Sequence, residues 1–238
     1  MLILGMDTAT PHVGVAIGDS ADGGRVLAEV LIAGDRRHAE QLAPAIKRVC
    51  DESGVRLDQL AAIAVGIGPG LFTGLRVGVT TAKVMAQALR IPVVAVSSLD
   101  LIASPLLDGH GGHAHALVVP VIDARRHEVF SARYRVVPGG MQREGEYTVG
   151  SVEELIADLE AGNEHVLLAG DGVSRYREQF AGLDRSDMAG PEFEAPSVAA
   201  LVQLATGRVE REEFVQPWDV HPMYLRESDA ELHWETPR

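Results

Sequence analysis

The sequence predicts an α/β protein made of two similar halves, each consisting of strands followed by helices. In both halves three consecutive strand patterns are followed by alternating helix and strand patterns. This order extends an antiparallel meander by parallel crossovers. The core has to be aliphatic, because 46% of the 238 residues are hydrophobic and only 5% are aromatic. A chain of this length can bury a substantial core.

The first half begins with three strands joined by short turns, at Leu2–Met6, Val13–Gly18 and Val26–Ala33. A helix is expected at Ala39–Cys50, because its apolar residues recur at helical spacing. The remaining elements are a strand buried on both faces, a long helix and another strand: Ala61–Ile67, Thr73–Leu89 and Pro92–Val96. A short helix from Ser97 or Ser98 to about Ala103 follows.

The second half repeats this order after a loop rich in glycine and histidine. Three strands are expected first, then a helix that begins after the N-cap Ser151, then a strand and two helices: Leu117–Ile122, His127–Val136, Gln142–Val149, Val152–Leu159, Val166–Ala169, Val173–Phe180 and Ser197–Ala205. Two such units in tandem indicate the ribonuclease-H-like duplication of the actin, Hsp70 and sugar-kinase superfamily. We therefore expect domains at 1–103 and 104–207, with a tail, 208–238, that packs back on them.

The long helix expected at Thr73–Leu89 has very little polar surface. Its few long polar side chains form one narrow stripe: Arg76, Thr80, Lys83 and Gln87. Small residues recur at every fourth position: Gly74, Gly78, Ala82 and Ala86. Such a row lets another helix approach closely, although each interior glycine costs about 1 kcal/mol relative to alanine. A helix of this kind lies deep in a core or is covered by a partner.

Composition excludes several classes of protein. The formal charge of −13 makes the chain alone a poor candidate for binding nucleic acid. One cysteine, Cys50, cannot form an internal disulfide and fits a reducing compartment. The apolar start stops at Asp7, so no signal peptide is expected, and the longest uncharged run, Ala61–Leu75, is too short to span a membrane. We expect a cytoplasmic protein.

Two turns could belong to a nucleotide cleft. In the actin-like superfamily the turn at Asp7–Thr10 cradles phosphate and its aspartate holds hydrated magnesium, although the same residues could simply cap a hairpin. The matching turn keeps Asp123 but has arginines in place of glycines, and the expected adenosine turn at Ala169–Gly172 is only partly kept. The cleft is therefore expected to be degenerate, without ATP hydrolysis, and to involve Asp7, Thr8, Thr10, Asp123, Arg126, Gly170 and Gly172.

Other motifs give weaker signals. The turn Gly66–Leu71 lacks both the dinucleotide fingerprint and the ending of a P-loop, so its glycines are interpreted as structural. Three histidines in a glycine loop are more typical of a solvated linker than of a metal site: His110, His113 and His115. The serines at 97 and 98 have no triad context, and a hydrolase is not supported.

Several segments resemble the bacterial TsaB (YeaZ) family, and the resemblance covers nearly the whole chain. The most specific segment is Gly66–Gly78, GIGPGLFTGLRVG, which continues to Ala82 and Lys83. Leu71 departs from the serine that is usual at its position. Further matching segments are Ile3–Thr10, His38–Pro44, Ile91–Leu99, Asp123–Arg126 and Tyr224–Arg226.

The resemblance implies a subunit of the machinery that makes N6-threonylcarbamoyladenosine, beside the anticodon of tRNAs that read codons beginning with adenine. In that system the paralogue TsaD catalyses the transfer and holds a metal through an H-x-x-x-H pair after the strand equivalent to Pro92–Val96. Those two positions are Ser98 and Ile102 here, and neither can replace imidazole. A non-catalytic paralogue is implied, with no metal and no cofactor of its own, while weak or interface-shared ATP or ADP stays open.

The resemblance also implies partners. In this family the first two helices pack against TsaD or a second TsaB, the ATPase TsaE joins the pair, and tRNA is reached only through the complex. The expected partner face comprises His38, Leu42, Ile46, Phe72, Gly74, Leu75, Arg76, Gly78, Val79, Ala82 and Lys83. An independent ATPase or small-molecule kinase is the alternative, because Asp7 and Asp123 could face one cleft. A metalloprotease is weaker, because the ligand pair is missing.

Overall fold

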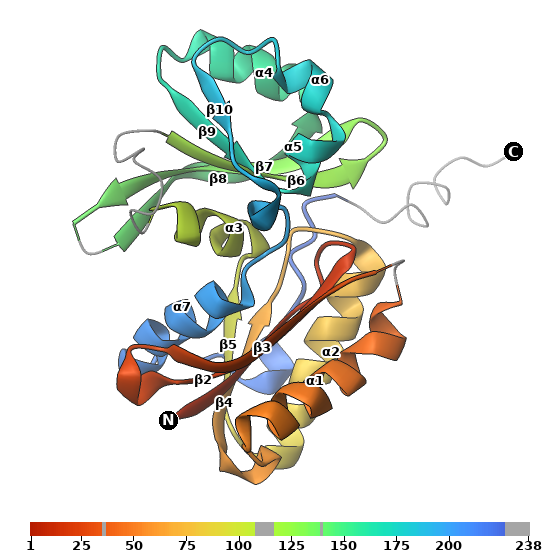
Figure 1. Cartoon of the computed structure of the whole chain (residues 1–238), viewed down its shortest axis with the longest axis vertical. Coiled ribbons are helices and arrows are strands. Elements are labelled where there is room, and N and C mark those ends of the chain that lie inside the picture. The colour runs from red at the N-terminus through yellow and green to blue at the C-terminus, as the bar shows by residue number, and fades with distance from the viewer. Residues whose placement is uncertain (35–36, 108–116, 139, 227–238) are drawn as a thin grey trace, which may run out of the picture.

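The computed structural model describes residues 1–34, 37–107, 117–138 and 140–226. The first of its two sheets has five strands in the order β3-β2-β1-β4-β5. The first three strands pair antiparallel, and β4 and β5 extend the sheet in parallel (Figure 1). Their bounds are β1 Leu2–Asp7, β2 His12–Asp19, β3 Arg25–Ala33, β4 Leu60–Gly66 and β5 Val93–Val96.

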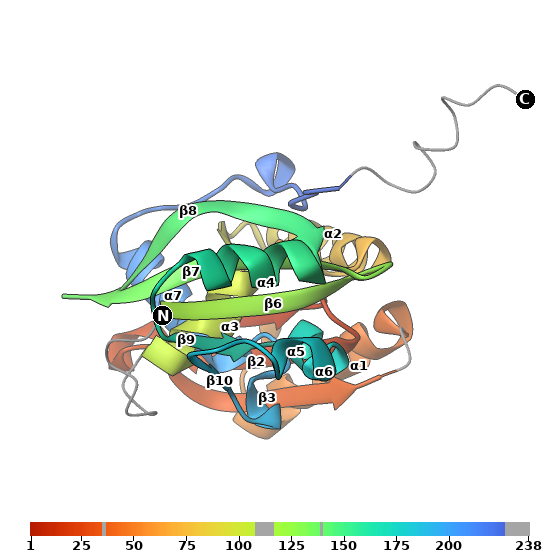
Figure 2. The same ribbon diagram turned by 90° about the horizontal axis from the view of Figure 1, so that it is seen from above.

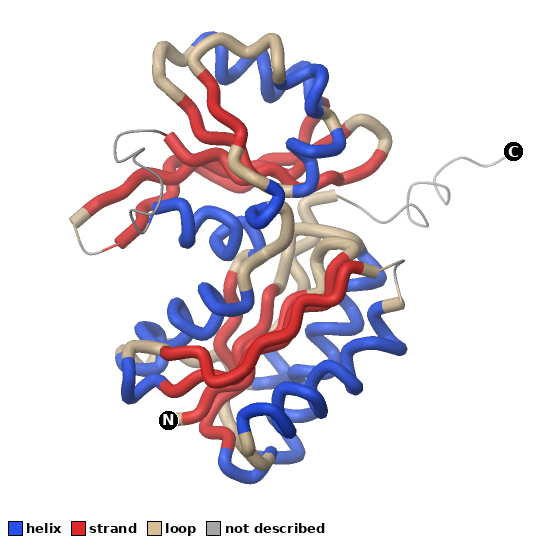
Figure 3. Tube along the Cα trace, in the orientation of Figure 1, coloured by secondary structure: helices blue, strands red, loops and turns tan. Residues whose placement is uncertain are grey.

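The second sheet has five strands in the order β10-β9-β6-β7-β8, which is the same connectivity read from the other edge. This repetition confirms the predicted fold class. Its strands are β6 Leu117–Arg125, β7 Glu128–Val137, β8 Gly140–Ser151, β9 Val166–Ala169 and β10 Ser186–Met188. The helices are α1 His38–Ser53, α2 Phe72–Leu89, α3 Ser98–Leu107, α4 Val152–Ala161, α5 Asp171–Arg175, α6 Arg177–Phe180 and α7 Val198–Glu210 (Figure 3).

The central strands of the first sheet are buried on both faces, which explains their continuous apolar sequence. In β1, Leu4 and Met6 pack in one cluster with residues of α1 and α2. Ile3 points to the opposite face and packs with residues of α7. The first sheet is thus a middle layer between α1 and α2 on one side and α7 on the other (Figure 1).

Two helices cover the sheet of the other half. Leu99 and Ile102 of α3 pack in the core of the second sheet, whereas Leu201 and Ala205 of α7 pack on the first. The expected boundaries at residues 103 and 207 had assigned α7 to the second half. An apolar face indicates only that a helix is buried, and the sequence pattern does not record which sheet buries it.

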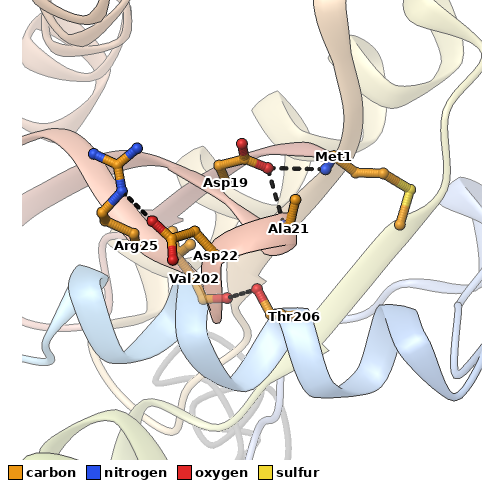
Figure 4. Close-up of polar contacts among 7 residues, drawn as sticks. All are labelled: Met1, Asp19, Ala21, Asp22, Arg25, Val202 and Thr206. Carbon is orange, nitrogen blue, oxygen red and sulfur yellow. Dashed lines mark hydrogen bonds and ion pairs between the residues drawn. The ribbon is translucent and has the colours of Figure 1, made fainter.

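The β2–β3 turn lies beside α7 and fixes the amino terminus. The Met1 ammonium and the Ala21 amide both donate to Asp19 Oδ1, at 2.9 and 3.0 Å (Figure 4). These two donors lower the pKa of Asp19. On α7, the Thr206 hydroxyl donates to the Val202 carbonyl at 2.9 Å. Gly24 allows the turn to approach, because a Cβ there would stand 2.9 Å from the Cα of the α7 residue Gln203.

Several element boundaries differ from the expectations. The helix expected at Val173–Phe180 is two short helices, α5 and α6, which meet at Tyr176, where φ is −111° and ψ is 31°. The sequence analysis missed β10, a three-residue strand with little apolar pattern. The predicted cap is confirmed, since Ser151 Oγ accepts from the Glu154 amide at 3.1 Å and the Glu154 carboxylate accepts from the Ser151 amide.

The C-terminal segment, residues 213–226, crosses α2 and then reaches the second sheet. Val215 pairs with Val93 at the edge of β5, and Lys83 Nζ donates to the Val220 carbonyl at 3.0 Å. Further on, Arg226 pairs with Glu128 at the start of β7, at 2.7 Å. Seen from above, this segment lies on the same side of the molecule as α2 (Figure 2). No helix among the described residues is long and apolar enough to cross a membrane.

Candidate functional site

The small residues of α2 pack against the chain's own β1–β2 turn. A Cβ on Gly74 would stand 2.1 Å from the Thr8 carbonyl oxygen, and one on Gly78 would stand 2.3 Å from Thr8 Oγ1. The Thr8 hydroxyl donates to the Gly74 carbonyl at 2.7 Å. The expectation that these glycines admit a partner helix is therefore corrected. The neighbour that comes close is a turn of the same chain.

Most of the other residues expected at the partner face are also used within the chain. His38 Nε2 bonds the Thr10 carbonyl at 2.8 Å. Leu42, Ile46, Leu75, Val79 and Ala82 are buried. Arg76 lies over the Phe72 ring and donates to the Tyr224 hydroxyl at 3.2 Å, so the C-terminal segment covers this end of α2. The sequence analysis did not connect this segment with α2.

The surface that α2 leaves open is a different stripe of the same helix. Thr73, Thr80 and Val84 are exposed, and the Val84 side chain is 59% accessible. Beside it a groove of about 760 Å³ separates α2 from α1 and the segment after α1. Its walls are mainly apolar and include Ala43, Ile46, Cys50, Val55, Leu57, Thr81 and Met85, together with the charged residues Lys47, Asp51 and Arg56. This stripe and the groove are called the α1–α2 face below.

The Asp7 carboxylate is enclosed at the end of β1. Its Oδ1 accepts from the Ala9 amide at 2.9 Å and its Oδ2 accepts from the Ser98 hydroxyl at 2.6 Å. Gly66 lies so close that a Cβ there would stand 1.8 Å from Oδ2. Burial raises the pKa of Asp7, although these hydrogen bonds and His38 act in the opposite direction. Both oxygens are thus committed to the protein.

Asp123 at the end of β6 is the counterpart of Asp7 and is also bonded internally. Its Oδ1 accepts from the Arg125 amide at 2.9 Å and from the Tyr176 hydroxyl at 3.1 Å. Its Oδ2 pairs with the guanidinium groups of Arg125 and Arg175, at 2.8 and 3.3 Å. The sequence analysis placed Asp171 in the expected adenosine turn but gave it no role; it accepts from the Asp123 amide at 3.0 Å. Burial, with Asp123 nearby, raises the pKa of Asp171 to about 7.

These arrangements do not fit the magnesium and phosphate roles that the superfamily gives to the two turns. A hydrated magnesium needs free carboxylate oxygens, whereas Asp7 is closed by Ser98 and Asp123 by two arginines. In the adenosine turn, Gly170 packs closely on β6, since a Cβ there would stand 2.2 Å from the Val121 carbonyl oxygen, and Gly172 is buried nearby. Thr8 and Thr10 are buried in the β1–β2 turn.

The two positions that correspond to the metal ligands of the paralogue serve packing. Ser98 bonds Asp7, and Ile102 is 1% exposed within the core of the second sheet. Across the described ranges, no group of three or more potential ligands is placed to hold a metal ion. The histidines at 110, 113 and 115 lie outside the described residues. The described residues therefore present an open, mainly apolar groove between α1 and α2. They also contain two turns whose aspartates are bonded within the chain.

Fold and site together define a class: actin-like α/β proteins with the two-sheet duplication, in which the aspartates at the two turns are bonded within the chain. Among solved structures, a Pseudomonas aeruginosa protein titled as having similarity to peptidase YEAZ superposes with a TM-score of 0.78. It is 31% identical, and the match covers 94% of this chain and 99% of that one. An ethanolamine utilization protein EutJ, at 12% identity and a TM-score of 0.52, shares only the fold.

Sequence comparison narrows the class to a family. A family model described as TsaD, tRNA N6-adenosine threonylcarbamoyltransferase, matches residues 25–234. The Bacillus subtilis tRNA threonylcarbamoyladenosine biosynthesis protein TsaB is 30% identical over 98% of both chains. An uncharacterized Mycobacterium tuberculosis protein is 35% identical over 96% of this chain and 93% of its own length. The chain belongs to the TsaB (YeaZ) family.

Proposed function

We propose that this chain is a non-catalytic subunit in the synthesis of tRNA N6-threonylcarbamoyladenosine. It pairs with a TsaD-type transferase, which transfers the threonylcarbamoyl group to adenosine 37, and TsaE joins this pair. Relatives in its family are described as tRNA threonylcarbamoyladenosine biosynthesis proteins, which supports the pathway. In the absence of the transferase, the chain forms a homodimer. The protein acts in the cytoplasm, where tRNA is modified.

The observation that carries the proposal is the α1–α2 face. Val84 is among the most exposed large hydrophobic residues and stands next to the groove of about 760 Å³. A mainly apolar groove with an exposed valine beside it is typical of a surface that another protein covers. The buried glycines of α2 support this face indirectly, since they hold the opposite side of the helix against Thr8 of the same chain.

The closed turns support the absence of catalysis by the chain itself. Ser98 takes one of the paralogue's two metal-ligand positions and is hydrogen-bonded to Asp7, so it is unavailable to a metal. The ATPase alternative would require Asp7 and Asp123 to open toward a shared nucleotide. Calorimetry of the isolated chain with millimolar magnesium and ATP distinguishes these ideas, because clear binding would favour the alternative.

Co-purification with the TsaD-type protein of the same organism tests the proposal. We expect the unmodified chain to co-purify, and Val84→Glu to lose association because a charge is buried in an apolar contact. Val136→Glu is the matched control, since Val136 lies on β7 and is 44% exposed. A modification assay with each subunit omitted should show no product from this chain alone. Wild-type recovery of Val84→Glu, or activity of the lone chain, would refute the proposal.

A further inference from the structure

The β6–β7 turn has a backbone that its residues do not suit. Arg125 pairs with Glu128, so Arg126 and His127 form a two-residue hairpin loop. The φ angles at Arg125, Arg126 and His127 are 68°, 56° and 61°, all in the left-handed region. Positive φ at both loop residues is the type I′ geometry, which strongly favours Asn-Gly or Gly-Gly. Arginine and histidine are retained here at a cost in stability, and such strain often marks a functional segment.

The side chains of this turn belong to a cluster of positive charge. The buried Asp123 carboxylate holds the guanidinium groups of both Arg125 and Arg175. One carboxylate therefore orients two guanidinium groups. The Arg175 side chain is 52% exposed, and Arg126 is exposed on the turn that follows Asp123. Partial protonation of Asp171 near neutral pH reduces the opposing charge further.

The C-terminal segment extends this cluster to the start of α2. Arg226 pairs with Glu128, the residue that follows the turn, and two residues earlier the Tyr224 hydroxyl accepts from Arg76. In both views the β6–β7 turn and the beginning of α2 lie on the same side of the molecule (Figures 1 and 2). We call this set the basic arc: Arg76, Arg125, Arg126, Arg175 and Arg226.

We propose that the basic arc contacts the sugar-phosphate backbone of tRNA when the chain is in its complex. The inference rests on the proposed function and modifies the expectation that tRNA is reached only through the partner. Exposed guanidinium groups on three separate elements suit a long polyanion better than a small enclosed anion. The half-exposed Tyr224 ring, 5.1 Å from the Phe72 ring, offers an aromatic surface beside Arg76. A local positive surface on a chain of charge −13 orients the RNA.

The decisive variant replaces Arg126→Asn together with His127→Gly. This pair suits the type I′ turn, so we expect the melting temperature to rise by a few degrees. The same change removes one charge of the arc, so tRNA affinity of the complex should fall several-fold at moderate salt. A second variant, Arg126→Gln with Arg175→Gln, should lower the affinity for tRNA at least tenfold. The slope of log affinity against log salt concentration should become shallower by about one for each charge removed.

Charge reversal at Arg25→Glu and Arg211→Glu provides the controls. Both arginines are exposed, and each is paired with a carboxylate of its own. Arg25 begins β3 and pairs with Asp19 at the end of β2, away from the β1–β2 turn. Fluorescence anisotropy with labelled tRNA is measured on the complex, whose formation is checked first by gel filtration. If the variants form an intact complex with unchanged tRNA affinity and unchanged salt slope, the inference is wrong while the proposed function stands. Equal losses of affinity in the controls would also overturn the inference and leave the proposed function standing. Failure of the unmodified chain to join its partner would refute the proposed function and the inference with it.

Discussion

Replacing Gly74 by alanine tests which neighbour the small residues of α2 serve. Alanine gains about 1 kcal/mol of helix propensity. Its Cβ, however, would stand 2.1 Å from the Thr8 carbonyl oxygen, which is backbone and cannot rotate away. Overpacking of this kind costs about 1–3 kcal/mol, and more where backbone has to shift. We expect a net loss of about 2 kcal/mol in the free energy of unfolding, which lowers the melting temperature by roughly 4–8 °C.

Gly207→Ala on α7 is the matched control. A Cβ there would meet only the flexible end of Arg211, at 3.4 Å, so the helix propensity should appear as a gain of up to about 1 kcal/mol. Calorimetric melting of the isolated chain is measured at several protein concentrations, because dimerisation would shift the midpoint. If Gly74→Ala melts at or above the wild-type temperature while association with TsaD is lost, the small residues serve the partner and the packing argument is wrong.

Three further predictions follow from buried polar groups. Ser98→Ala removes the hydroxyl that donates to the Asp7 carboxylate at 2.6 Å, and should lower the free energy of unfolding by about 2–3 kcal/mol in urea titration. The raised pKa of Asp171, about 7 in place of 3.8, means that the folded state binds the proton more tightly. Stability from this group is present at low pH and is lost as pH rises from about 4 to 7, by up to about 1.4 kcal/mol per unit. Asp171→Asn should flatten that slope, and an unchanged profile would contradict the assignment. Tyr134→Phe deletes the hydroxyl that donates to the buried Asp100 at 2.6 Å, with an expected loss of about 1–3 kcal/mol that thermal melting would show.

The elements that the sequence predicted well are those with a strong apolar period or a clear cap. β4 and α2 fall within one residue of the expected ranges, because a buried strand and a small-residue helix leave few alternatives. Ser151 is confirmed as an N-cap since its capping box is local. β10 was missed because three residues at a sheet edge carry no readable pattern. The break between α5 and α6 was missed because it depends on the backbone conformation of a single residue, Tyr176.

The glycines of α2 show how a correct residue pattern can be assigned to the wrong neighbour. Gly74 and Gly78 require a close neighbour, and the sequence contains that information. Whether the neighbour is Thr8 of the same chain or another protein depends on how β1 and α2 meet, which no local pattern encodes. The contact between the C-terminal segment and α2 was missed for the same reason. Tyr224 lies 148 positions after Arg76, and no local pattern indicates that the two side chains meet.

The sequence by itself determined most of the order of strands and helices, the aliphatic core and the family, because these depend on local periodicity and on contiguous motifs. Tertiary structure alone decided that α7 covers the first sheet, that Asp7 is closed by Ser98, and that arginines of three elements meet at one surface. Contacts between segments far apart in the chain arise from the packing of whole elements, and that packing is a property of the folded sheet layers. The surfaces proposed for partner and tRNA contact are therefore created only by the assembled fold.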